Sequence, residues 1–101
     1  MTGPANIKKS ASNIPTRSLK DIEVTGNILE YIPQESAQHY RIVPIGVKDG
    51  VLEVGATNPN DLEARDALNF ISSRIGMPYK LFLISESDFS LMLDKYKGLT
   101  G

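Results

Sequence analysis

Two strand-like segments joined by a tight-turn sequence constrain the fold of this chain most strongly. Residues 41–47 (Arg-Ile-Val-Pro-Ile-Gly-Val) and 51–56 (Val-Leu-Glu-Val-Gly-Ala) are rich in β-branched residues, and Lys-Asp-Gly at 48–50 separates them. Asp and Gly accept the positive φ angles of tight hairpin turns, so the two segments are predicted to pair as a β-hairpin. Pro44 has no backbone N–H to donate, so its strand is predicted to lie at a sheet edge or to be paired on one side there. Glycine in a strand often marks a close backbone approach, and Gly55 is expected to face a packed helix.

A helix is predicted directly after the hairpin. Asn58 can accept hydrogen bonds from the free N–H groups of a first helical turn, Pro59 suits the first helical position, and Asp61 stands three residues after the cap. Gly76 is expected to end this helix as a C′ glycine. The inward-facing apolar stripe of the helix is Ala64, Ala67, Leu68, Ile71 and Ile75.

Three further segments complete the predicted fold. Apolar residues between Ile28 and Tyr40 recur near a helical period but are interrupted by Pro33, which fits either two short helical turns or one helix that begins at Pro33. We expect a helix at residues 33–39. A third strand is expected at residues 79–84, where the continuously apolar second half is typical of a strand covered on both faces. Residues 85–88 (Ser-Glu-Ser-Asp) match a capping box and predict a last helix that ends at Gly98. Its inward positions are Phe89, Met92, Leu93 and Tyr96.

The order of these elements is α-β-β-α-β-α. It predicts an α/β (α+β) sandwich, in which a small sheet of about three strands, including the hairpin, packs against helices.

The first 26 residues differ from the rest of the chain. Residues 1–20 contain four basic side chains and no acidic one, and they are rich in Ser, Thr, Asn, Pro and Gly. Such a segment buries too little surface to offset a backbone ordering cost of roughly 1–2 kcal/mol per residue. We therefore expect residues 1–26 to form a disordered basic arm or linker, residues 27–98 to fold, and residues 99–101 to begin a linker. The arm is either a solvated leader or an electrostatic tether to acidic lipid or RNA.

The composition excludes several classes of protein. The 101 residues include no Cys and one His, which excludes a disulfide scaffold, a cysteine-ligated zinc site and a thiol nucleophile, and argues against a histidine-built metal site. The net charge of −1 gives no global attraction to nucleic acid or anionic lipid. No apolar run approaches the ~18 residues of a membrane span, and the N-terminus does not resemble a secretory signal. We expect a small cytoplasmic module.

No catalytic or metal-binding constellation is predicted. His39 could act as a base with Glu35 on the same helix face, but an exposed histidine at a helix end explains the pair more simply. Asp61, Glu63 and Asp66 could suggest oxygen ligands for a metal, yet acidic residues are what a helix N-terminus favours. The chain also lacks the G-x-x-x-x-G-K-S/T phosphate-binding loop. The sequence is therefore typical of a binding or docking module.

Several segments in order resemble a known family. They are residues 31–37 (Tyr-Ile-Pro-Gln-Glu-Ser-Ala), 40–45 (Tyr-Arg-Ile-Val-Pro-Ile), 49–56, 58–64 and 84–96. Together they resemble the N-terminal domain of the type II secretion and type IV pilus assembly ATPases, and the resemblance covers about residues 28–98. The positions that carry the family pattern are Ile32, Pro33, Ala37, Pro44, Gly50, Leu52, Asn58, Pro59, Asp61 and Ala64.

The resemblance implies a docking role. In that family the domain precedes a hexameric ATPase motor and docks it onto the cytoplasmic part of an inner-membrane assembly platform. ATP and magnesium belong to the motor, so the resemblance implies no catalytic, cofactor-binding or metal-binding residue in this segment, and hexamers only with the motor domain. It also implies a cytoplasmic location, peripheral to the inner membrane through partners, without a membrane span or nucleic acid. It does not identify the docking residues.

Two alternatives remain at this point. Some relatives bind cyclic di-GMP through two R-L-G-x-x-L motifs in a preceding helical region, which makes a cyclic di-GMP-sensing domain the main alternative. This sequence contains no Arg-Leu-Gly, and its first 26 residues are too polar to supply that region. The other alternative is a stand-alone binder of RNA or lipid that acts through its basic arm.

Overall fold

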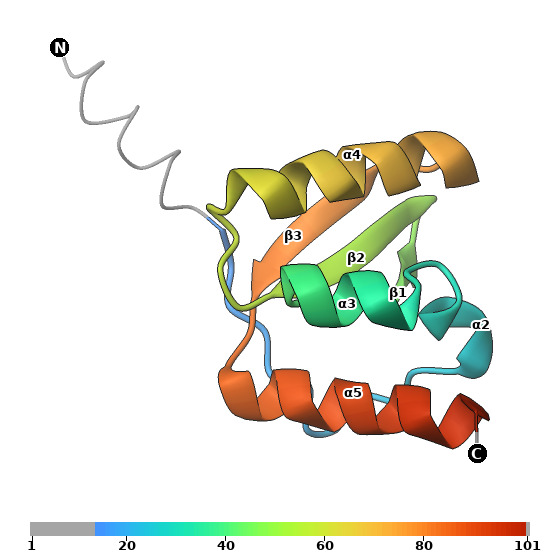
Figure 1. Ribbon diagram of the computed structural model, residues 1–101, viewed down its shortest axis with the longest axis vertical. Helices are drawn as coiled ribbons and strands as arrows, with labels where there is room; N and C mark the ends of the chain where they lie inside the picture. The colour runs from blue at the N-terminus through green and yellow to red at the C-terminus, as the bar shows by residue number, and fades with distance from the viewer. Residues whose placement is uncertain (1–13, 101) are drawn as a thin grey trace, which may run out of the picture.

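The computed structural model describes residues 14–100 and confirms the predicted class (Figure 1). It is an α+β fold with one three-stranded mixed sheet, and it contains one short helix, α2, that the predicted element order lacked. The elements are α2 (Gly26–Leu29), α3 (Gln34–Tyr40), β1 (Ile42–Lys48), β2 (Val51–Ala56), α4 (Leu62–Ile75), β3 (Tyr79–Leu83) and α5 (Glu86–Thr100).

The predicted hairpin forms the first two strands of the sheet. The strand order is β1-β2-β3, with β1 antiparallel and β3 parallel to β2. Asp49 and Gly50 have φ angles of 54° and 77°, as the predicted turn requires. Strand β1 lies at an edge of the sheet, in agreement with its proline, and its register is irregular between Pro44 and Gly46.

The helices enclose the sheet. In Figure 1 the sheet lies between α4 and α5, and α3 lies in front of the sheet and contacts both helices. Within residues 14–100, no helix combines the length and hydrophobicity needed to span a membrane. The largest fully buried side chains come from nearly every element and include Leu29, Ile32, Ile42, Leu52, Leu68 and Met92.

The start of α4 differs from the prediction, although its end agrees with it. The N-cap is Asp61, whose Oδ1 accepts a hydrogen bond from the Glu63 N–H at 3.1 Å. Asn58 is not the cap, because the helix begins only after Asp61. The Asn58 carbonyl accepts from the Asp61 N–H at 3.1 Å and closes a turn before the helix. Gly76 ends α4 with φ 72°, as predicted for a C′ glycine.

The predicted disordered arm is wrong for residues 14–26. The segment 14–25, here called the N-terminal strap, runs beside the end of β3. The Leu83 N–H donates to the Pro15 carbonyl at 2.8 Å, and the Arg17 N–H donates to the Leu83 carbonyl at 2.9 Å. The rest of the predicted arm, residues 1–13, lies outside the described residues.

Apolar side chains hold the strap against the core. Leu19 is 2% exposed, and Ile22 and Val24 are partly buried against the core cluster. Burial of this apolar surface offsets the ordering cost on which the prediction of disorder rested. Arg17, counted as a basic residue of the arm, pairs with Glu53 at 3.4 Å.

Helix α5 forms a hydrogen bond with the strap and extends further than predicted. Asp88 is 4% exposed, and its Oδ2 accepts from the Leu19 N–H at 3.0 Å. Its own N–H donates to the Ser85 Oγ at 3.1 Å, which is one half of the predicted capping box. The helix passes Gly98 and includes residues 99–100, so the predicted helix end at Gly98 is wrong.

Tyr96, near the C-terminal end of α5, contacts the segment between α2 and α3. Its hydroxyl donates to the Ile32 carbonyl at 2.6 Å in a buried position. Burial raises the pKa of the Tyr96 hydroxyl well above its usual range.

Two expectations about packing at the sheet are corrected. Strand β3 is not covered continuously on both faces, because Leu81 is only partly buried and Leu83 is 37% exposed. Gly55 does mark a close approach, but its neighbours are not on a helix. A Cβ added there would lie 2.8 Å from Ile84 Cγ2 and 3.4 Å from Ile45 Cδ1.

Candidate docking surface

The residues singled out as possible catalysts or ligands do not converge. Among the described residues, no three His, Asp or Glu side chains are grouped closely enough to hold a metal ion. Asp61 is used as the cap of α4. His39 is exposed in the last turn of α3, and within residues 14–100 it forms no hydrogen bond or ion pair with Glu35. A base needs an orienting partner, whereas the interaction described for His39 is a perpendicular packing of its ring with the Tyr40 ring, with centroids 4.6 Å apart.

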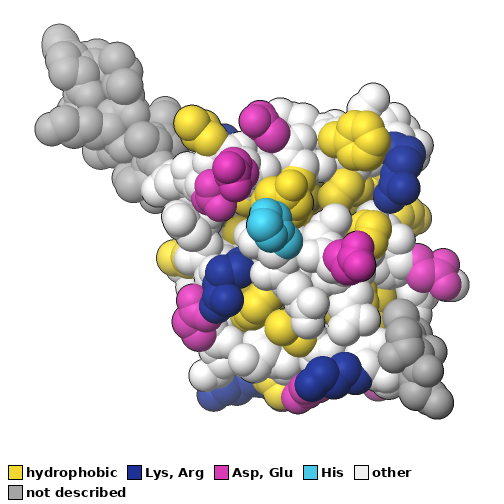
Figure 2. All heavy atoms as spheres, in the orientation of Figure 1, with side chains coloured by type: hydrophobic (Ala, Val, Ile, Leu, Met, Phe, Trp, Pro, Cys, Tyr) yellow, Lys and Arg dark blue, Asp and Glu magenta, His cyan; other side chains and the backbone are white. Residues whose placement is uncertain are grey.

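A surface groove of about 540 Å³ lies between α3 and α4. Residues from α3 line it at spacings of three and four, and residues from α4 line it at spacings of three, four, seven and eight, so each helix contributes one face. Figure 2 shows the single histidine (cyan) on this face, with hydrophobic side chains beside it. The lining residues are Ser36, His39, Tyr40, Glu63, Asp66, Ala67, Phe70 and Ile71, and we call this surface the α3–α4 groove.

Phe70 gives the groove an exposed aromatic side chain. It is 69% exposed, whereas Ile71 beside it is 4% exposed and belongs to the core. Full burial of a Phe side chain is worth about 1.5–3 kcal/mol, so most of this free energy is still available to a partner. Phe70 was not predicted as a functional residue from the sequence. The sequence did contain a signal for it, because Phe70 is an aromatic residue outside the predicted inward-facing stripe of α4.

Two carboxylates give the groove negative charge. Glu63 and Asp66 are exposed, and neither takes part in an ion pair with the residues that the structure describes. They lie three residues apart on α4, and Phe70 follows Asp66 four residues later, so the three side chains share one side of the helix. The groove therefore combines an exposed aromatic side chain with two carboxylates that form no ion pair among the described residues.

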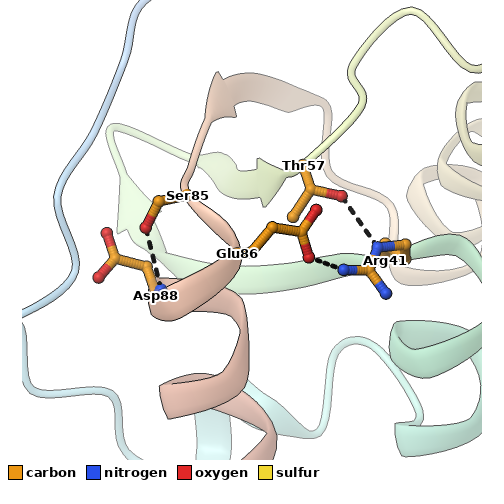
Figure 3. Close-up of polar contacts among 5 residues, drawn as sticks. All are labelled: Arg41, Thr57, Ser85, Glu86 and Asp88. Carbon is orange, nitrogen blue, oxygen red and sulfur yellow. Dashed lines mark hydrogen bonds and ion pairs between the residues drawn. The ribbon is translucent and has the colours of Figure 1, made fainter.

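Arg41 forms polar contacts at the end of α3. Arg41 was predicted to begin the first strand, but it is the C-cap of α3, with a left-handed φ of 57°. Its Nε donates to Thr57 Oγ1 at 3.2 Å, and its guanidinium pairs with Glu86 (Figure 3). The guanidinium carbon also lies 4.7 Å from the centroid of the Phe89 ring. Arg41 therefore links the end of α3 to the start of α5 through contacts at the protein surface.

The residues of the family pattern lie elsewhere. None of them lines the α3–α4 groove. Gly50 forms the hairpin turn, Pro33 and Asp61 stand at helix N-caps, and Asn58 is exposed before α4. The buried members are Ile32, Ala37, Pro44, Leu52, Pro59 and Ala64. These positions support the fold and its turns, and they do not mark the exposed surface.

Comparison with known sequences points to one family. The family model described as the MshEN domain matches residues 12–101. The type IV pilus assembly ATPase PilB of Myxococcus xanthus is 26% identical over 88 residues. That alignment covers 87% of this chain and 15% of PilB, so the chain spans a small part of the length of this relative.

Solved structures share the fold. The structure of MshE with cdg superposes with a TM-score of 0.75 at 21% identity, covering 94% of this chain and 67% of that one. The N-terminal domain of XpsE gives a TM-score of 0.67 at 17% identity, covering 90% of this chain and 62% of that domain. At these identities the likeness establishes the arrangement of helices and strands.

Proposed function

Because this chain belongs to the MshEN domain family, which forms the N-terminal domain of type II secretion and type IV pilus assembly ATPases, we propose that it docks and regulates such a motor. It couples the motor to the cytoplasmic part of an inner-membrane assembly platform protein. The observation that carries the proposal is the family match over residues 12–101.

The small share of PilB that this chain matches fits this role. The chain matches 15% of PilB, which leaves most of that ATPase outside the matched segment. In our proposal a P-loop motor domain C-terminal to this segment binds ATP and magnesium, hydrolyses ATP and forms the hexamer. The domain itself contributes a surface, and its contact with the platform holds the protein at the cytoplasmic side of the inner membrane.

Binding to the platform protein is the direct test. The full 101-residue chain is titrated with the purified cytoplasmic part of the platform protein from the same source, and heat is measured by calorimetry. We expect saturable binding and, in a separate assay, no ATP hydrolysis by the chain alone. Absence of binding at concentrations of about 100 μM, far above a typical specific affinity, would overturn the docking role.

A cyclic di-GMP-sensing role is the second candidate. It is favoured by the structural likeness to MshE, which was solved with cdg, a ligand that we interpret as cyclic di-GMP. The absence of Arg-Leu-Gly from this sequence counts against it. Amide chemical shifts of the chain that move and saturate with cyclic di-GMP would support sensing, and a spectrum unchanged at millimolar ligand would exclude it.

A further inference from the structure

We propose that the α3–α4 groove is the docking face and that its occupant is a basic amphipathic helix of the platform protein. This inference rests on the proposed docking function and adds the face and the chemistry of the partner.

The shape of the groove suits a helix. Its walls are two helices of 7 and 14 residues, which correspond to roughly 10 and 21 Å at a rise of 1.5 Å per residue. A third helix can place its side-chain ridge between two such neighbours, with anchors at positions i, i+3 or i+4, and i+7. An occupant of two to three turns would cover the length that α3 and α4 share.

The apolar part of the groove supplies the anchor point. Phe70 projects into solvent, and the small side chain of Ala67 lies one turn before it on α4. Across the groove, the partly buried Tyr40 provides a second aromatic surface. Exposed aromatic residues above a packed floor are typical of the few positions that dominate binding energy at an interface.

The charge of the groove selects the partner. Glu63 and Asp66 lie along the same side of α4 as Phe70 and have no cationic partner among the described residues. Lysine or arginine on the occupant would supply the missing charge and speed the encounter. The same carboxylates repel nucleic acid, anionic lipid and nucleotide phosphates. In a symmetric dimer through this face they would also oppose one another, which disfavours a second copy of this chain.

Two groove variants test the face. Phe70→Ala removes the anchor, and Glu63→Lys combined with Asp66→Lys reverses the charge; all three positions are exposed, so the fold should be retained, as far-UV circular dichroism can verify. We expect each variant to weaken binding of the platform's cytoplasmic part by about tenfold or more. The charge reversal should act mainly by slowing association and by reducing its salt dependence.

Matched controls come from the exposed side of α5. Leu91→Ala removes an apolar side chain that is 43% exposed, and Asp94→Lys reverses a carboxylate with a side-chain exposure of 71%. Both should change the affinity by less than about twofold. If the wild-type chain binds and the groove variants bind equally well, the assigned face is wrong while the docking function stands. If the wild-type chain does not bind at all, the docking function and this inference both fall.

Peptides identify the occupant. Twenty-residue peptides tiled along the cytoplasmic part of the platform protein are titrated against the full chain. The binding peptide should carry lysine or arginine beside an apolar stripe of helical period, and it should gain helical circular dichroism when bound. A binding peptide that is acidic, or that stays non-helical, would overturn the assignment of the occupant.

Discussion

Gly55 in β2 permits the close contact between the sheet and the chain that leads into α5. A Cβ at this position would lie 2.8 Å from Ile84 Cγ2 and 3.1 Å from Ile84 Cδ1, whereas carbon atoms in good contact are about 3.5–4.0 Å apart. Ile84 is 3% exposed and Ile45, the third neighbour, is 4% exposed, so neither side chain can turn into solvent. Gly55→Ala must therefore displace packed core atoms.

The size of the effect follows from two opposing terms. An extra methyl group in a packed core costs about 1–3 kcal/mol, and replacing glycine by alanine within a strand recovers about 0.5–1 kcal/mol. We expect Gly55→Ala to lower the free energy of unfolding by about 1–2 kcal/mol. Gly46→Ala in β1 is the matched control, because a Cβ there meets no atom within 4 Å. It should leave stability unchanged or raise it slightly.

Urea unfolding followed by far-UV circular dichroism measures both variants. For a chain of this size, each kcal/mol corresponds to roughly 4–8 °C in Tm, so thermal scans give a second readout. A double-mutant cycle with Ile84→Ala separates crowding from backbone effects. The alanine at position 84 removes both atoms nearest to the new methyl group, so Gly55→Ala should cost at least about 1 kcal/mol less in that background. Strictly additive costs, or a Gly55→Ala variant as stable as Gly46→Ala, would refute the crowding argument.

Two further substitutions probe single hydrogen bonds. Tyr96→Phe leaves the buried Ile32 carbonyl without its donor and should cost about 1–3 kcal/mol in urea unfolding at neutral pH. Because burial raises the pKa of Tyr96 above the unfolded value of 10.0, its contribution is complete below about pH 10 and is lost as the pH rises further; wild-type stability should therefore fall more steeply than that of the variant in alkaline urea titrations. Asp61→Ala removes the cap that accepts from the Glu63 N–H and should cost about 1 kcal/mol, whereas Asp61→Ser should retain most of the stability; equal losses in both would argue against capping.

The parts of the fold predicted correctly depend on local chemistry. The hairpin turn and the end of α4 follow from residue types that tolerate positive φ. The observed φ angles of Asp49 and Gly50 in the turn, and of Gly76 at the helix end, agree with this. The apolar stripe of α4 is likewise visible in its own spacing, since Leu68 and Ile71 are buried as predicted. In each case the information lies within a few residues of the element concerned.

The missed parts depend on distant contacts. Leu19, Ile22 and Val24 follow neither a helical nor a strand period, and their burial depends on residues far away in the sequence. The Leu19 N–H, for example, donates to Asp88, 69 residues later. The groove was missed for a related reason. Phe70 alone is one exposed aromatic residue on a helix, and it lines a groove only because α3 lies beside α4.

The order in which the ribosome makes this chain has a consequence for the strap. Leu19 is synthesised long before Asp88, and at about 5–20 residues per second the 69 residues between them take roughly 3–14 s. During that time the helix that accepts the Leu19 N–H does not yet exist, so Leu19 cannot form its native contact with Asp88. Among the described residues, the first segment to be translated is therefore one of the last to reach its native position.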